Sequence, residues 1–141
     1  MKRVTTPGGI VAVYVWDYSG KMDILNKFWD AAVTINPKAS TLQEAYRFPN
    51  STAEALWGSF ETAGFVDIES TPIDIETHFH DFDDYWNPFL GGQGPAPTYL
   101  MSLDDAQRTK LRDLLVGSLP IQDDGSIRMD ARAWAVKGKR E

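Results

Sequence analysis

The chain has 141 residues, which is enough for one ordinary domain with a single hydrophobic core but short for two. Its formal net charge of −6 opposes nonspecific binding to a polyanion, so nucleic acid is not expected as a partner, and the absence of cysteine excludes disulfides, thiolate catalysis and zinc-thiolate sites. The hydrophobic content of 43% indicates a folded domain, and no segment reaches membrane-spanning length, so no membrane partner is expected and the expected localisation is cytoplasmic.

The first element is an almost unbroken apolar run, residues 9–16, which follows the turn Pro7-Gly8-Gly9. Because a surface strand would alternate with polar positions, this run predicts a strand buried on both faces at the centre of a sheet. Its partners are expected from later parts of the chain or from another chain. Asp17 follows directly, at the edge where open α/β sheets bind ligands, and capping of the next helix is an equally open role for it.

Helical patterns occupy the next part of the chain. Apolar residues at steps of three and four predict a helix over 22–33, and residues 38–50 read as a short helix plus loop. Ser51-Thr52-Ala53-Glu54 has the sequence of a capping box and predicts the start of another helix. Gly64 supplies the left-handed residue that ends it.

The middle of the chain returns to an extended pattern over 66–79, in which Pro72 predicts a bulge or an exposed edge. Aromatic residues at helical spacing then predict a helix over 82–89. The glycine- and proline-rich residues 91–97 read as a loop or linker, and the last helix is expected to open at Ser102.

Alternation over 127–136 predicts a final strand, followed by a charged tail over 137–141. The order of elements predicts a single domain over 1–141 of the α/β class. Its sheet is expected to be small and mixed, made by residues 9–16, 66–79 and 127–136, with helices packed on it.

Three motifs in this order resemble the C-terminal half of class I S-adenosylmethionine-dependent methyltransferases. They are the Pro7-Gly8-Gly9 turn before an apolar strand, the segment Glu61-Thr62-Ala63-Gly64-Phe65-Val66-Asp67-Ile68, and the turn Asp124-Gly125-Ser126 before the last strand. In that family such motifs precede the fifth, sixth and seventh strands, and the seventh runs antiparallel between the other two. The resemblance implies a three-layer, Rossmann-like fold.

The resemblance also implies a function, an S-adenosylmethionine-dependent methyltransferase acting on a small-molecule acceptor. The family holds its cofactor mainly through a glycine-rich loop after the first strand and an acidic residue that ends the second, and this sequence contains neither. Met1 therefore looks like an internal methionine used as a start or the boundary of a fragment. The chain is expected to supply the acceptor side, to be inactive alone, and to homodimerise or be complemented by an N-terminal half. A noncatalytic α/β module that self-associates or binds a small ligand is the competing interpretation.

In such enzymes, residues after the fifth strand and the insertion before the seventh shape the acceptor pocket and its lid, here residues 78–119. The resemblance thus makes nine residues candidates for substrate binding. They are Trp16, Asp17, Tyr18, His78, His80, Phe82, Tyr85, Trp86 and Phe89.

Several of these candidates have other possible roles. His78 and His80 lie beside Asp81 and could bind a metal, could polarise or deprotonate an acceptor, or could be polar residues where a strand leaves the sheet, and no metal is assigned. The four aromatic residues suit an apolar pocket, a hydrophobic core or a subunit interface. Gly91-Gly92-Gln93-Gly94 follows no strand and precedes no Gly-Lys-Ser/Thr, so it is not a phosphate loop.

Overall fold

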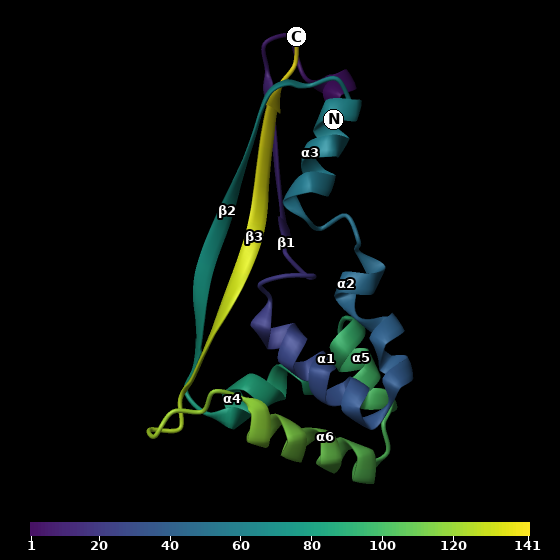
Figure 1. Cartoon of the computed structure of the whole chain (residues 1–141), viewed down its shortest axis with the longest axis vertical. Helices are drawn as coiled ribbons and strands as arrows, with labels where there is room; N and C mark the ends of the chain where they lie inside the picture. The colour runs from purple at the N-terminus through teal and green to yellow at the C-terminus, as the bar shows by residue number, and fades with distance from the viewer.

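A computed structural model describes residues 1–141, and it shows an elongated molecule built on one long, narrow sheet (Figure 1). Helix α3 lies along one end of the sheet, where both chain termini also lie. Most of the other helices gather at the opposite end (Figure 1). The sheet therefore joins two separate groups of helices.

Three strands form the sheet: β1 (Ile10–Trp16), β2 (Val66–Phe79) and β3 (Ile127–Lys139), in the order β1-β3-β2. Both neighbouring pairs are antiparallel, so β1 and β2 run in the same direction on either side of β3. The α/β class and the three strands are confirmed. The expectation of a mixed sheet is wrong because no parallel strands are neighbours, and the residues expected as a charged tail extend β3 to Lys139.

The helical elements comprise six α-helices and three short 3-10 turns. In chain order they are η1 (Lys2–Val4), α1 (Asp23–Ile35), η2 (Pro37–Leu42), α2 (Glu44–Arg47), α3 (Ala53–Thr62), α4 (Phe82–Trp86), η3 (Asn87–Gly91), α5 (Pro95–Ser102) and α6 (Asp105–Ser118).

The helix ends follow local chemistry, with one shift from expectation. The N-cap of α3 is Thr52, whose hydroxyl accepts from the Ala55 backbone N–H at 3.2 Å, so the capping box expected at Ser51 is wrong by one residue. Gly64 has φ 74°, as predicted for the residue that ends this helix. At α6, the capping box is formed by Asp104 and Gln107.

Helix α5 lies where the sequence predicts a loop or linker and a last helix from Ser102. Gly94, at φ 94°, occupies its N-cap, and Pro95 is its first residue. A proline at this position lacks only an N–H that would be unpaired in any case, and its fixed φ suits a helix. The glycine and proline composition thus marks a helix start, and Ser102 is the end of this helix instead of the start of the next.

The sheet buries a different face at each of its ends. Ile127 and Met129 of β3 belong to a large core with α1 and helices α4–α6, whereas Val136 packs with Phe60 and Phe65 beside α3. Successive strand residues point to opposite faces. Odd-numbered positions of β3 are therefore buried at the end with the large core, and even-numbered positions are buried at the end beside α3. Helices therefore cover opposite faces of the sheet at its two ends.

Strand β1 lies at an edge of the sheet, and the expectation that it is central and buried on both faces is wrong for this chain. Val11 is its only buried residue, and Tyr14 is 78% exposed. Val11 and the partly buried Val13 pack in the smaller core beside α3. The opposite face of the strand, which carries Ile10, Tyr14 and Trp16, is largely exposed. The apolar run thus reflects one packed face and one exposed apolar face.

The outer edge of β1 is also open. Asp17 N donates to Arg132 O at 2.8 Å, and Arg140 N donates to Gly9 O at 2.8 Å, so the odd-numbered residues of β1 form the ladder with β3. Because alternate residues of an antiparallel strand bond to opposite sides, the backbone groups of Ala12 and Tyr14 point away from the sheet.

Strand β2 is the other edge, as predicted for a strand that contains Pro72. Pro72 lies opposite Trp134 in a regular part of the ladder. The register shift lies instead between Val66 and Glu69, where Asp67 has φ 50°. The irregularity is therefore caused by this left-handed residue and not by the proline.

A substitution at Gly138 tests the packing of β3 against Phe60 and Phe65 beside α3. A Cβ added at Gly138 would lie 2.9 Å from both Phe60 Cδ1 and Phe65 Cβ, whereas one added at Gly58 in α3 meets nothing within 4 Å. We expect Gly138→Ala to lower the free energy of unfolding in urea, because overpacking costs about 1–3 kcal/mol, more than the gain of about 0.5–1 kcal/mol from replacing a strand glycine. The control Gly58→Ala should raise it by about 0.8–1 kcal/mol. Equal stability of Gly138→Ala and the wild type would contradict this packing.

Candidate functional site

Three adjoining hollows surround the segment η2–α2, near the end of β1. The first, here called the α2–α5 hollow, has a volume of about 420 Å³ and lies between α2 and α5. The second, the β1-end hollow, has about 390 Å³ and reaches Val15 and Tyr18. The two share Arg47 and Phe48 as a common wall. Both volumes lie in the range of small-molecule sites, about 300–1,000 Å³.

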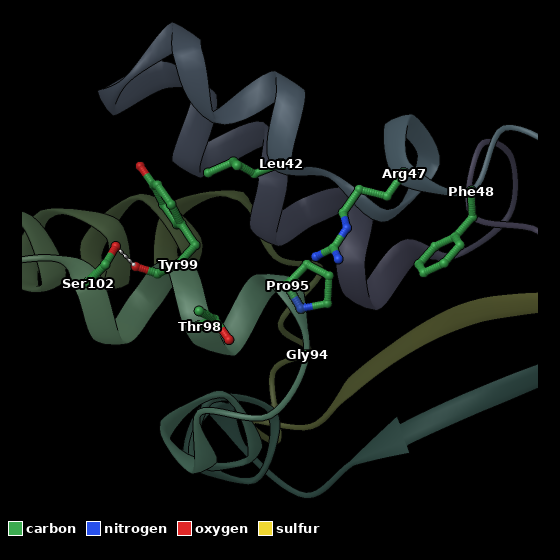
Figure 2. A pocket seen from close by; sticks show the side chains of 8 residues that line it. All are labelled: Leu42, Arg47, Phe48, Gly94, Pro95, Thr98, Tyr99 and Ser102. Carbon is green, nitrogen blue, oxygen red and sulfur yellow. Dashed lines mark hydrogen bonds between the residues drawn. The ribbon is translucent and has the colours of Figure 1, made fainter.

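Figure 2 shows the α2–α5 hollow, with Arg47 and Phe48 at one end and Tyr99 and Ser102 at the other. The Arg47 side chain extends toward Pro95 (Figure 2). Ser102 Oγ donates to the backbone oxygen of Tyr99 at 2.6 Å. The Tyr99 hydroxyl is buried without a hydrogen-bond partner, and burial raises the pKa of this phenol.

The β1-end hollow has an aromatic wall and a second unpaired hydroxyl. The rings of Tyr18 and Phe48 lie 5.5 Å apart between centroids. The pKa of Tyr18 is raised, first by burial and then by the negative charge of Glu44. Ser51 Oγ is buried and has no hydrogen-bond partner. Of the three candidates around the end of β1, Tyr18 is the one that lines this hollow.

Glu44 is a buried carboxylate that the sequence analysis did not single out. It is 6% exposed, and one of its oxygens accepts a hydrogen bond from Trp29 Nε1 at 2.5 Å. This bond joins α2 to α1 across the interior, and Glu44 also lines a third hollow of about 360 Å³ together with Phe79, Tyr85 and Phe89. Glu44 and Arg47 lie in a segment read only as a short helix plus loop, and no motif marked either residue.

Asp17 is buried, and its carboxylate closes the loop after β1. Its Oδ2 accepts from Lys21 N at 3.4 Å and lies against Gly20, where a Cβ would overlap the carboxylate. The N-cap of α1 is Met22, so the alternative in which Asp17 caps this helix is wrong. Trp16 is 41% exposed on the uncovered face of the sheet.

The two histidines lie at the end of β2, with ring centroids 5.6 Å apart, and neither lines the three hollows. The neighbouring Asp81 uses Oδ1 to accept from Asp84 N at 2.9 Å and caps α4. No group of three or more His, Cys, Asp or Glu side chains in the chain could hold a metal ion. The metal-binding alternative for His78 and His80 therefore lacks a third ligand.

The aromatic residues of α4 and η3 lie mainly in the core. Tyr85, Trp86 and Phe89 are buried, and Phe89 stacks on Phe28 with centroids 4.7 Å apart. The Tyr85 hydroxyl donates to Ile24 O at 3.0 Å, and burial raises the pKa of this phenol. Phe82 is half-buried and stacks on Trp86. Tyr85 and Phe89 also line the third hollow, so these two residues have both a packing role and an accessible side.

A network of ion pairs covers the exposed face of β2 and β3, away from the hollows. Arg132 donates two hydrogen bonds to the carboxylate of Asp74, at 2.6 and 2.8 Å, and lowers the pKa of that carboxyl. Lys21 lies 3.0 Å from Asp130. These groups satisfy one another, so the network stabilises the sheet surface and leaves no free charge for a ligand.

Neither protein-family models nor curated proteins gave a match to this chain. None of its helices combines the length and the apolar content needed to cross a bilayer.

The Trp29–Glu44 bond can be tested through stability. Trp29→Phe removes the indole N–H and leaves a buried carboxylate without its donor, so we expect the free energy of unfolding to fall by about 1–3 kcal/mol. The same substitution in a Glu44→Leu background measures only the loss of packing, and the double-mutant cycle isolates the bond. An equal cost of Trp29→Phe in both backgrounds would contradict a stabilising hydrogen bond.

Proposed function

We propose that this chain is the acceptor-side half of an S-adenosylmethionine-dependent methyltransferase with a Rossmann-like fold. The single observation that carries the proposal is the strand order β1-β3-β2 with β3 antiparallel to both neighbours. The family has this arrangement for its fifth, seventh and sixth strands.

The connections between the strands also support the proposal. The Pro7-Gly8-Gly9 turn leads into β1, and Gly64, in the left-handed conformation, lies between the end of α3 at Thr62 and the start of β2 at Val66. Helices α4, α5 and α6 lie between β2 and β3, the position of the insertion that shapes the acceptor pocket in the family. Helix α5 forms one wall of the α2–α5 hollow. An acceptor site between the end of β1 and this insertion follows from the proposal.

The residues of this chain do not fit S-adenosylmethionine itself. The family binds it on a glycine-rich loop that connects a strand to a helix, whereas the segment Gly91-Gly92-Gln93-Gly94 follows the 3-10 turn η3. No other segment offers consecutive glycines after a strand. Under the proposal the cofactor site belongs to a separate half, and this chain contributes acceptor binding and orientation.

The open edge of β1 suits such a second half. The backbone groups of Ala12 and Tyr14 point outward, and the face with Ile10, Tyr14 and Trp16 is exposed and apolar. Further strands paired to this edge would satisfy the backbone groups, and a helix packed on this face would bury the side chains.

The proposal predicts how the chain responds to the cofactor. In a calorimetric titration, S-adenosylmethionine should give no binding heat with the chain alone, because the loop that holds it is elsewhere. Sequencing the DNA upstream of the Met1 codon should reveal a segment that encodes a strand, a glycine-rich loop and a helix. Co-expression of that segment with the chain should yield a complex that binds S-adenosylmethionine.

Two results would overturn parts of this proposal. Binding heat with the chain alone would exclude its assignment as the acceptor half. Upstream DNA that encodes neither a glycine-rich loop nor an acidic residue after a second strand would remove the methyltransferase assignment.

The second candidate function is a noncatalytic module that self-associates, and the open edge of β1 is the observation that favours it. Two antiparallel copies of Ile10–Trp16 centred on Val13 would place Ala12 opposite Tyr14 of the other copy. The result would be a continuous six-stranded sheet with no exposed edge at its centre.

Light scattering at increasing protein concentration tests self-association. We expect a dimer for the wild type and a monomer for Ala12→Pro, because proline removes an outward N–H while leaving the bonds between β1 and β3 in place. Ala12→Ser keeps this N–H and serves as the matched control, which should remain dimeric. A wild-type chain that stays monomeric at millimolar concentration would exclude this candidate.

A further inference from the structure

We propose that the α2–α5 hollow binds a small organic carboxylate that has an apolar, ring-sized body and a hydrogen-bond donor at its far end. The hollow has three features that together define this class of ligand: an unpaired guanidinium, apolar walls, and hydroxyl oxygens that are free to accept.

Arg47 supplies the guanidinium. The seven ion pairs of the chain do not include Arg47, and its side chain makes no hydrogen bond within the protein. Figure 2 shows the guanidinium extended over Pro95 at one end of the hollow. A planar guanidinium that has no partner in the protein can donate two parallel hydrogen bonds to the carboxylate of a ligand.

The count of charges favours a carboxylate over a phosphate. Arg47 is the only Lys or Arg among the residues that line the hollow, and no Asp or Glu lines it. One guanidinium neutralises the single negative charge of a carboxylate. A phosphate monoester carries about 1.5 to 2 negative charges at pH 7, so one guanidinium does not neutralise it. The protein as a whole has a net charge of −6, so a second negative charge would be unfavourable.

Two hydroxyl groups line the hollow, Ser102 at the end away from Arg47 and Thr98 nearer Pro95 (Figure 2). Ser102 Oγ donates its proton to Tyr99 O at 2.6 Å, and Thr98 Oγ donates to Gly92 O at 3.3 Å. Each hydroxyl oxygen then retains lone pairs for a donor of the ligand. The Tyr99 hydroxyl has no partner in the protein, but it is closed off from solvent and is not one of these acceptors. An O–H or N–H group on the ligand would match these oxygens.

Leu42, Phe48, Pro95 and the ring of Tyr99 form the apolar surface between the two polar ends. The volume of about 420 Å³ accommodates a single aromatic or aliphatic ring with short substituents. Apolar walls with a few separated polar groups fix the orientation of such a ligand.

This ligand would be the methyl acceptor if the chain acts in methyl transfer, and to that extent its biological role rests on the proposed function. Binding itself does not, because every group named belongs to this chain. The test below uses no S-adenosylmethionine, so its result and that of the cofactor titration are independent.

The probe is 4-hydroxyphenylacetate, which carries a carboxylate and a phenol O–H on opposite sides of one ring. Titration into the nitrogen-15-labelled full chain should shift the amide signals of residues 47–48 and of the non-proline residues among 94–102. The neutral analogue 4-hydroxyphenylacetamide should bind at least tenfold more weakly, because charged hydrogen bonds contribute about 1.5–3 kcal/mol.

Arg47→Gln should raise the dissociation constant for 4-hydroxyphenylacetate at least tenfold and leave its weak affinity for the amide unchanged. Arg3→Gln is the matched control, since Arg3 is exposed, lies in η1 and does not line the hollow, and it should bind like the wild type. The spectrum of each variant without ligand shows whether its fold is retained.

Three results would overturn the inference: no shifts in residues 94–102, equal affinity for the acid and the amide, or unchanged binding in Arg47→Gln. Tighter binding of phenyl phosphate than of the carboxylate would replace the proposed ligand class. If binding fails while upstream DNA encodes the cofactor loop, only this inference is excluded.

Discussion

The structure depends on β3 lying between β1 and β2 while contributing to two separate cores. Ile127 and Met129 close the core of α1 and helices α4–α6, and Val136 closes the smaller core against α3. The two antiparallel ladders that β3 forms with β1 and β2 hold these cores at opposite ends and on opposite faces of the sheet. The helices pack on one face of the sheet at each end, so neither face is covered along its whole length. The exposed apolar face of β1 is the consequence.

The hollows follow from the same arrangement. Helix α1 begins after β1 and packs under β3, and the bond from Trp29 to Glu44 ties α2 to it. This attachment places Arg47 and Phe48 across from α5, and Tyr18 beside Phe48. The candidate ligand site is thus formed by one segment that precedes β2 in the sequence and one that follows it. Its polar groups are few and separated, which is typical of sites that orient a ligand.

Local patterns predicted much of the fold. Alternation of side chains located β2 and β3. Gly64 marked the end of α3, and Pro72 indicated a bulge or an exposed edge, of which the edge is observed, because the backbone properties of glycine and proline hold wherever these residues lie. Helix α5 was missed because the composition of 91–97 is typical of a loop, although Pro95 also suits the first turn of a helix. At Ser51 the shift of one residue reflects two neighbouring hydroxyls that are both suitable caps.

The sequence by itself determined the three strands and most of the helices, and its negative charge disfavours binding to a polyanion. It did not determine that Ile10–Trp16 is an edge strand, because an apolar run is compatible with burial on one face or on two. The tertiary structure alone decided that Arg47 has no carboxylate partner and that Glu44 is buried against Trp29. Pairing and burial are properties of contacts between distant segments. A residue's type and its neighbours in the chain do not specify those contacts.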